Sequence, residues 1–582
     1  MPESRVISTS QPADTVTFTV LSEGEAIPRT ISVQSIAIWQ EVNRVPIAKL
    51  TILDGSPAQQ TFSVSDQDLF LPGKAIEIKA GYHSDEATIF RGIVTRHRIK
   101  VRSNGANALI VECGHEVIKM TQVPTSRYFY DATESDIWEE LLDNYDLQGD
   151  IPATSFTHHQ LLQFQSTDWD FLVARAEMNG RFVIAEPQEV HIKAPDFGQD
   201  ITQAVTFGAT LLSLDAEIDA ATQLAAVHSR TWDFSKTENT EVQASSATPV
   251  TPGNLQATDL ADVFGGNELF LRNSAKQADE LLQAWADATL LRHELAKVRG
   301  RAQFQGIPEI SAGKIIELHG IGERFNGRAF VSGVRHNISQ GNWLVDVQFG
   351  LSPEPFARQF PISQTPAAGL APAVHGLQIG VVTQLQDDPE ADERVQVNIP
   401  VVNADEQGVW ARLGTVGAGG ERGFVFRPEI GDEVVVGFVN GDPSHPVILG
   451  SLHSSNLPAP IAASDDNHEK GWITRGEVEL RLNDDEPSVL VKLPSGRTIE
   501  LSDDAEHIEI KDDTGNTIRL DSDGITIESA SDIVLKATGD INLEAMNLNS
   551  TTQVGTKLES SATAELSASG STTIRGGIVQ IN

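Results

Sequence analysis

The sequence predicts a mainly β, multidomain protein that ends in a trimeric β-rod. Residues 15–102 form runs in which apolar and polar residues alternate, separated by Gly, Pro and Asp, which is typical of strands joined by turns. Residues 377–455 hold short β-runs between Gly- and Pro-rich turns, over a length that fits a small barrel. No Phe, Trp or Tyr occurs after Trp472, where aliphatic residues recur in pairs separated by one residue.

Length, charge and cysteine content restrict the function. A chain of 582 residues predicts roughly four domains. The net charge of -38 repels phosphate backbones and anionic membranes, so we expect no nucleic-acid partner. The single cysteine, Cys113, cannot form an intramolecular disulfide and is expected to be a buried core residue. The start, MPESRVISTS, lacks the apolar segment of a signal peptide, which predicts synthesis in the bacterial cytoplasm without one.

Residues 1–362 are predicted to combine strands with three helices. The opening strands imply a barrel or sandwich, and strands return at residues 302–349. The first helix places Ile137, Trp138 and Leu141 on one face and has Thr133 as its N-cap. The second spans residues 167–179, and the third spans about residues 274–298 with Gly300 as its stop. A polar stretch, residues 235–254, is expected to be an exposed loop, and residues 363–376 are the predicted linker.

The C-terminal pattern predicts the rod. Each predicted strand offers only one or two inward aliphatic side chains, so a single chain cannot bury them, whereas three intertwined chains can. The axis of such a rod is too narrow for aromatic rings, which accounts for their absence. A single-chain solenoid is the alternative, but it needs about 20 or more residues per turn. The pairs are Ile499/Leu501, Ile508/Ile510, Ile518/Leu520, Ile525/Ile527, Ile533/Leu535 and Ile541/Leu543, and Leu558, Leu566 and Ile574 continue the eight-residue spacing of the last three.

Several motifs resemble one family. PEIGDEVVVGFVNGDPSHPVILG, residues 428–450, resembles the OB-fold barrel of VgrG proteins and tailed-phage needle proteins. QSTDWDFLVARAEMNGRFV, residues 165–183, and GERFNGRAFVSGVRHNIS, residues 322–339, resemble the hub domains of the same family. The resemblance implies a hub of two tube-like β-barrels with helical insertions over residues 1–362. An OB-fold barrel over residues 377–455, a connector over residues 456–488 and a triple-stranded β-helix spike over residues 489–582 would follow.

The resemblance also implies function and partners. It predicts a homotrimeric spike and hub of a contractile injection system, with inner tube and tube-initiator proteins, baseplate proteins and effector cargo as partners. A PAAR-type protein would cap the tip. The segment GERFNGRAFVSGVRHNISQGNW favours an extracellular phage-tail-like particle, released or anchored in the cell, over a type VI secretion VgrG or a phage tail spike. The residues predicted to bind the cap are Ile574, Gly576, Gly577, Ile578, Val579, Ile581 and Asn582.

The sequence predicts no catalytic, cofactor-binding or metal-binding residues. The connector is too short for a hydrolase core, and its carboxylates are interpreted as solvated loop charges. The last histidine is His507, with no His-x-His pattern beyond it, so a metal at the tip is not expected within this chain. The alternative of another class is a cell-wall or polysaccharide-degrading enzyme. Those carboxylates include Asp465, Asp466, Glu469, Asp484, Asp485 and Glu486.

Overall fold

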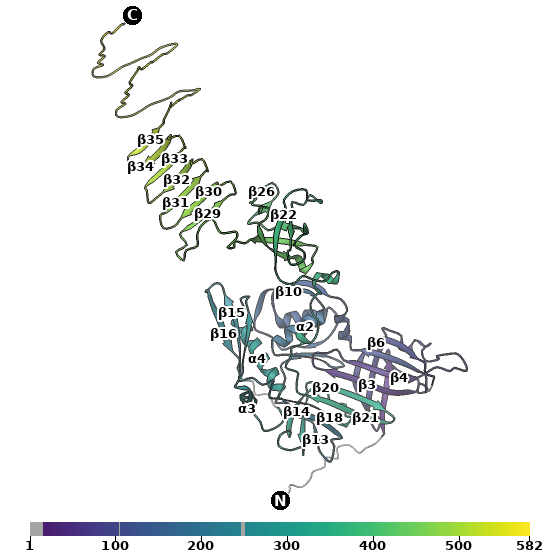
Figure 1. Cartoon of the computed structure of the whole chain (residues 1–582). Coiled ribbons are helices and arrows are strands. Elements are labelled where there is room, and N and C mark those ends of the chain that lie inside the picture. Colours follow the sequence, from purple (N-terminus) through teal and green to yellow (C-terminus); the bar gives the residue numbers. More distant parts are fainter. Residues whose placement is uncertain (1–14, 104, 246–250, 582) are drawn as a thin grey trace. The chain divides into compact units, whose positions relative to one another are not determined.

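The computed structural model describes residues 15–103, 105–245 and 251–581 (Figure 1). The chain divides into two compact units. The first comprises residues 1–375 with 439–443, and the second comprises residues 376–438 with 444–582. None of the helices in the described part of the chain has the length and apolarity needed to span a bilayer.

One sheet of 13 strands forms the centre of the first unit. The strands from the start of the chain and those from residues 298–349 join where β3 pairs with β20, with Ile36 opposite Ile338 and Ile38 opposite His336. The β3–β20 pairing therefore links the strands of the two predicted tube-like barrels through backbone hydrogen bonds. Its strands are β1 (Val16–Ser22), β2 (Glu25–Ala26), β3 (Val33–Glu41), β4 (Ile47–Leu53), β5 (Ala75–Tyr82), β6 (Asp85–Lys100), β7 (Ala108–Gly114), β13 (Ile201–Thr206), β14 (Ser213–Ile218), β18 (Val298–Gln305), β19 (Ile315–His319), β20 (Gly327–Ser339) and β21 (Asn342–Phe349).

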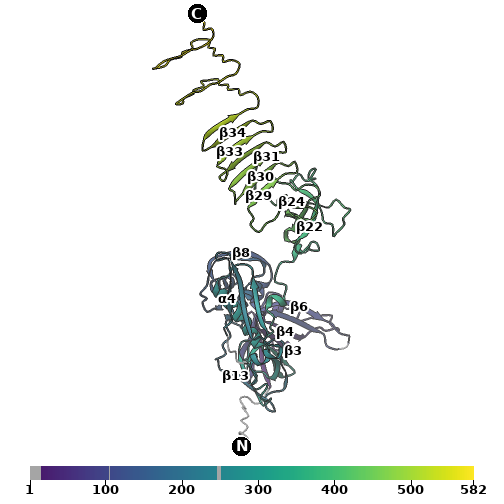
Figure 2. The same ribbon diagram turned by 60° about the vertical axis from the view of Figure 1, so that its left-hand side comes forward.

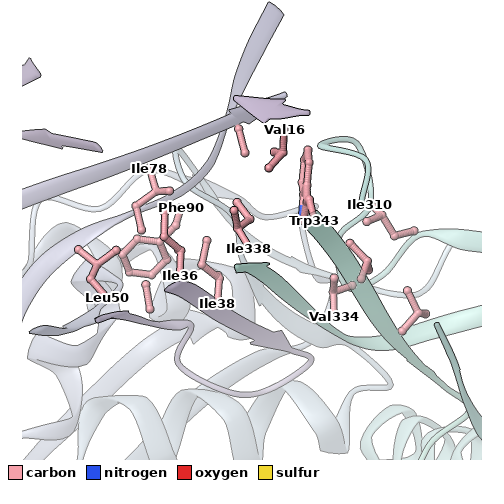
Figure 3. Packing of buried hydrophobic residues seen from close by; sticks show 14 of the residues in the cluster. Val16, Ile36, Ile38, Leu50, Ile78, Phe90, Ile310, Val334, Ile338 and Trp343 are labelled. Carbon is pink, nitrogen blue, oxygen red and sulfur yellow. The ribbon is translucent and has the colours of Figure 1, made fainter. Parts of the chain in front are cut away.

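The apolar face of this sheet makes the largest core. Ile36, Leu50 and Ile78 are fully buried and gather around Phe90, while Trp343 lies beside Val16 and Ile338 in the same core (Figure 3). These side chains come from the alternating positions that the sequence pattern assigns to one face. Cys113 belongs to the same core, where burial raises the pKa of its thiol to about 12, so its predicted place in the core is confirmed.

Two predicted helices of the first unit are confirmed together with their caps. In α1 (Glu134–Asp143), the Thr133 hydroxyl accepts a hydrogen bond from the Asp136 amide at 3.2 Å, and the Asp136 carboxylate accepts one from the Thr133 amide at 2.8 Å. Thr167 caps α2 (Asp168–Met178), and Gly180 takes the left-handed conformation, φ +65°, that follows many helices. A second core packs around these helices and β8 (Thr125–Thr133), β9 (Gly149–Asp150), β10 (Thr157–Ser166), β11 (Phe182–Ala185) and β12 (Val190–Lys193).

The third helix is shorter than predicted. It is α4 (Asp279–Leu295), because the Lys276 ammonium pairs with Asp233 at 2.7 Å and the Ala275 carbonyl accepts a bond from Thr231 at 2.6 Å, which hold the preceding segment extended. Gly300 does not end it. That glycine lies inside β18, where a Cβ would meet the Asp215 carbonyl oxygen at 2.4 Å.

The segment predicted as an exposed loop at residues 235–254 contains a strand. That strand, β16, pairs with β15, which shields its backbone groups, while residues 246–250 lie outside the described residues. Short elements complete the unit: β15 (Ala226–Asp233), β16 (Glu238–Gln243), β17 (Glu268–Asn273), α3 (Ala257–Ala261), α5 (Phe356–Gln359), η1 (Asp68–Phe70), η2 (Glu116–Thr121), η3 (Asp262–Phe264), η4 (Pro366–Gly369) and η5 (Val439–Gly441).

The second unit begins with a closed five-stranded barrel in the order β22-β23-β24-β28-β27. Val382, Val395 and Val436 are buried in its centre. Gly431, at φ +94°, forms the predicted turn into β27. The barrel strands are β22 (Gln378–Gln384), β23 (Val395–Asn398), β24 (Val409–Leu413), β27 (Glu433–Phe438) and β28 (Pro446–Ser451), and β25 (Ala418–Gly419) pairs with β26 (Arg422–Gly423) in a separate hairpin.

A seven-stranded antiparallel sheet follows the barrel, with each strand paired to the next (Figure 1). It begins at Glu469, inside the segment predicted as a connector. After Glu528 the described residues 529–581 form no further strand. The trimer stays a prediction. The strands are β29 (Glu469–Ile473), β30 (Glu479–Asn483), β31 (Ser488–Lys492), β32 (Thr498–Ser502), β33 (His507–Lys511), β34 (Thr517–Asp521) and β35 (Gly524–Glu528).

Candidate spike face and tip

The register of the seven-stranded sheet aligns its aliphatic residues in two columns. Each strand from β30 to β35 contributes the two residues at its second and fourth positions, whereas β29 contributes Trp472 at its fourth position. The residues at these positions lie on the same face because strand side chains alternate. The strands lie one after another like rungs (Figure 2). One column is Trp472, Leu480, Val491, Ile499, Ile510, Ile518 and Ile527, and the other is Leu482, Val489, Leu501, Ile508, Leu520 and Ile525. We call these two columns the aliphatic face.

No layer of other described residues covers the aliphatic face within one chain. Ile499 is 44% exposed and Ile510 is 45% exposed, whereas Val436 in the neighbouring barrel is 0% exposed. Soluble proteins rarely leave such a contiguous apolar surface open unless it meets a partner. The face is therefore the strongest candidate for an assembly surface in the second unit.

The opposite face of the sheet carries ion pairs both within a strand and between neighbouring strands. The Arg519 guanidinium lies 2.8 Å from Asp521 and 3.8 Å from Glu509. The Glu479 carboxylate lies 2.7 Å from Arg481 and 3.6 Å from Lys492. Ion pairs of this kind contribute little to stability but keep a surface solvated, so this is the face suited to water.

The sequence analysis missed the first strands of this face, although the same signal marks them. Leu480 and Leu482 form an aliphatic pair separated by one residue, and so do Val489 and Val491. The single aromatic residue in the columns, Trp472, lies in the first strand, where its ring stacks on Phe426 of the barrel segment at a centroid distance of 6.3 Å. Aromatic rings thus end where the columns of aliphatic residues begin.

The aliphatic pairs beyond β35 are also exposed in the single chain. Ile533 and Leu535 are 55% and 70% exposed, and Ile541 and Leu543 also lie largely in solvent. A segment without ladder hydrogen bonds or buried side chains has little to hold it in one conformation by itself. Within one chain, this segment therefore has even less to hold it in place than the seven-stranded sheet has.

The predicted tip residues lie at the end of that segment. The apolar side chains of Ile574, Ile578, Val579 and Ile581 are exposed, and the backbone bends at Gly577 and Ile578, next to Gly576. Asn582 lies outside the described residues. None of the other residues that the structure describes covers these tip residues, and their role in binding a cap stays a prediction.

The six acidic residues singled out in the predicted connector lack the buried environment of a general acid. Asp465, Asp466 and Glu486 are exposed, and Lys470 pairs with Asp484, which keeps the pKa of that carboxyl below its usual range. A general acid needs the opposite environment, because burial is what raises the pKa of a carboxyl group. The remaining two, Glu469 and Asp485, are exposed as well.

Comparison with known proteins gives matches to both units. The family model described as the Alg8 N-terminal domain matches residues 12–340, and the model of the type VI secretion system/phage-baseplate injector OB domain matches residues 378–453. Among curated proteins, the chain is similar to the actin cross-linking toxin VgrG1 of Vibrio cholerae, at 37% identity over 99 residues, which is 15% of this chain and 9% of the relative. It is also similar to the type VI secretion system spike protein VgrG1b of Pseudomonas aeruginosa, at 25% identity over 218 residues, which is 34% of this chain and 28% of the relative.

These matches differ in how far they reach. The chain spans less than a third of the length of either curated relative. Among solved structures, a chain of the Francisella PdpA-VgrG complex aligns with 88% of this chain and 80% of its own length, at 9% identity and a TM-score of 0.39, which is too low to establish a common fold. The Alg8 N-terminal domain model covers more than half of the chain.

Proposed function

Because the chain belongs to the Alg8 N-terminal domain family and is VgrG-like, with an injector-type OB barrel, we propose that it is the homotrimeric spike and hub of a contractile injection system. In this role the first unit joins the inner tube, and the seven-stranded sheet with the segment after it forms the puncturing spike. The observation that carries the proposal is the aliphatic face, which one chain leaves exposed.

Three copies of the sheet can bury the aliphatic face between them. If each sheet forms one side of a three-sided rod, the two columns point to the axis and the charged face points to water. Burying one Ile or Leu side chain contributes roughly 1.5 to 3 kcal/mol, and each strand supplies up to two of them per chain. Closure also pairs or covers the strand edges, which would otherwise invite aggregation.

The partners follow from this arrangement. We expect inner tube, tube-initiator and baseplate proteins at the first unit, effector cargo carried by the assembly, and a PAAR-type protein on the apolar tip that includes Ile578 and Val579. The chain would be made in the bacterial cytoplasm and assembled there into a contractile particle. We favour the extracellular, phage-tail-like type. The type VI secretion mode is the alternative, and the names of the curated relatives support it.

The proposed role is mechanical rather than enzymatic. The curated relative VgrG3 of Vibrio cholerae is named a spike protein, and the six carboxylates singled out in residues 456–488 are exposed. The competing proposal, a wall or polysaccharide hydrolase, predicts release of soluble fragments from peptidoglycan or polysaccharide by the purified chain. Such release, abolished by replacing a single carboxylate, would replace the mechanical role with the enzymatic one.

The proposal is tested by the mass of the full chain in solution. Native mass spectrometry should give three times 62.9 kDa. Ile510→Glu should abolish this species, since it places a carboxylate in the aliphatic face. Thr526→Glu is the matched control, because it adds the same charge on the opposite face, across from Arg519, and should leave the trimer intact. A monomeric wild-type chain would sink the proposal.

Gene order distinguishes the two modes of action. A contractile sheath, several tube proteins, a tape-measure protein and an AAA ATPase encoded beside this chain support the extracellular particle. An inner-membrane anchoring complex encoded there instead would favour type VI secretion.

A further inference from the structure

Three side chains of the kinds that bind metal ions converge on the charged face of the seven-stranded sheet. They are Glu500 of β32 and His507 and Glu509 of β33, and one potential ligand atom from each lies within 4.8 Å of the other two. Glu500 and Glu509 are directly opposite each other in the antiparallel pair, and His507 is opposite Ser502, two residues along. The pairing of the two strands therefore brings these groups together.

The imidazole of His507 is held in an orientation that suits a ligand. Its Nδ1 lies 3.2 Å from the carbonyl oxygen of Ala505, which can only accept a hydrogen bond, so this nitrogen carries the proton. Its Nε2 then has a free lone pair. That atom is buried and has no hydrogen-bond partner among the described residues, and it lies 3.7 Å from the Glu500 carboxylate, too far for a hydrogen bond. In metal sites, the same division of roles between the two ring nitrogens is the rule.

The two carboxylates and the Nε2 lone pair of His507 face one another with no hydrogen-bond donor among the described residues at the centre of the group. Two carboxylates placed directly across a strand pair repel each other. Arg519 approaches Glu509 at 3.8 Å, but its Nε donates to Asp521 at 2.8 Å, so it offsets only part of this charge. A lone pair and two carboxylates that face one another are stabilised by a cation between them.

We propose that Glu500, His507 and Glu509 bind one divalent transition-metal ion per chain, of the Zn²⁺ class. One imidazole nitrogen and two carboxylate oxygens suit Zn²⁺, whereas Mg²⁺ and Ca²⁺ favour oxygen ligands alone. The side chains of His507, Glu500 and Glu509 are 11%, 36% and 21% exposed, so water can complete the coordination from the open side. The ion would fasten β32 to β33 on the outside of the rod, away from the aliphatic face.

This site is independent of the proposed spike function, since all three ligands come from one chain. The test uses the full-length protein after dialysis against EDTA, titrated with Co²⁺ and Zn²⁺. We expect one Co²⁺ per chain with visible d–d absorption bands, displaced by Zn²⁺. His507→Gln and Glu500→Gln should each weaken binding at least about tenfold, because each removes a direct ligand.

The matched control is Glu506→Gln, which removes an exposed carboxylate from the turn next to His507 and should bind Co²⁺ as the wild type does. Circular dichroism and native mass spectra show whether a variant that binds Co²⁺ weakly is still folded, and so distinguish loss of a ligand from unfolding. Absence of a stoichiometric Co²⁺ site in the wild type overturns the inference, and so does unchanged affinity in a folded His507→Gln variant. A failure of the spike proposal appears instead as a change in mass.

Discussion

Asp168, the first residue of α2, is the centre of a buried polar cluster in the first unit. Its carboxylate accepts two hydrogen bonds of 2.9 Å from Arg127, and one each from Tyr145 at 3.0 Å, Gln163 at 2.8 Å and Thr125 at 2.9 Å. Asp168→Ala should destabilise the unit by about 3 to 5 kcal/mol, because it leaves Arg127 without its counter-charge. Urea unfolding followed by tryptophan fluorescence measures the loss.

Asp131→Asn is the control for this prediction, because Asn also tolerates the positive φ of +47° at this position. The Asp131 carboxylate is 78% exposed and pairs with His159, whose side chain is 96% exposed, so loss of its charge should leave the urea midpoint unchanged. Equal midpoints for Asp168→Ala and the wild type would show that the buried cluster contributes no net stability.

His336 makes the stability of the first unit depend on pH. Burial lowers the pKa of its imidazole to about 4, and the indole of Trp343 donates to its Nδ1 at 3.3 Å. The unfolded chain takes up a proton near pH 6.5, whereas the folded chain does so only near pH 4. Stability should therefore fall as pH decreases through this window, by on the order of 3 kcal/mol from this residue alone.

The pH prediction is tested with His336→Gln, which keeps an acceptor for Trp343 but does not titrate. Between pH 7 and pH 5 the wild type should lose more of its melting temperature than the variant does. His159→Gln, at a 96% exposed side chain, should behave as the wild type. Parallel pH profiles for the wild type and His336→Gln would contradict the assignment.

At the scale of elements, Gly300 fixes the packing of β18 between its neighbours. A Cβ at this position would lie 2.4 Å from the Asp215 carbonyl oxygen and 2.6 Å from the Phe349 ring. Gly300→Ala should cost about 1 to 3 kcal/mol through overpacking. Hydrogen exchange of the amides in β14, β18 and β21 should become faster. Gly450→Ala, in a strand where nothing lies within 4 Å of the added Cβ, should leave exchange in its own barrel unchanged.

Local signals account for the elements that the sequence predicted well. Thr133 and Thr167 mark two helix starts because a cap is a contact within four residues of chain. The predicted start of α4, at about residue 274, was wrong, since Lys276 is held by Asp233, which lies 43 residues earlier in the chain. Long-range contacts of this kind leave no periodic mark in the sequence.

The candidate sites show the same division. The aliphatic pairs predicted one face of the rod because alternation within a strand is local. The group of Glu500, His507 and Glu509 was not predicted, because it depends on which residues face each other across two strands. The turn at residues 503–506 sets the register of the β32–β33 hairpin, and the sequence pattern does not reveal the geometry of this turn.

At the scale of the whole molecule, the tip decides whether the spike is capped. Replacing both Ile578 and Ile581 with Asp should abolish binding of a purified PAAR-type protein encoded beside this chain, because it charges the apolar end. Native mass spectrometry should still show three chains, since the aliphatic face is untouched. Thr572→Asp, also exposed, should bind the cap normally. Retained binding by the folded double variant would place the cap elsewhere.

The strict alternation in the rod sheet also governs how three chains find their correct alignment. A slip of one residue in β32, β33 or β34 would turn the charged residue of that strand, Glu500, Glu509 or Arg519, toward the axis and its aliphatic residues toward water. Such an assembly buries unpaired charge and loses its apolar contacts, so it falls apart faster than the correct one. Assembly of the proposed trimer is therefore self-correcting: chains that meet out of step separate and pair again until all three agree.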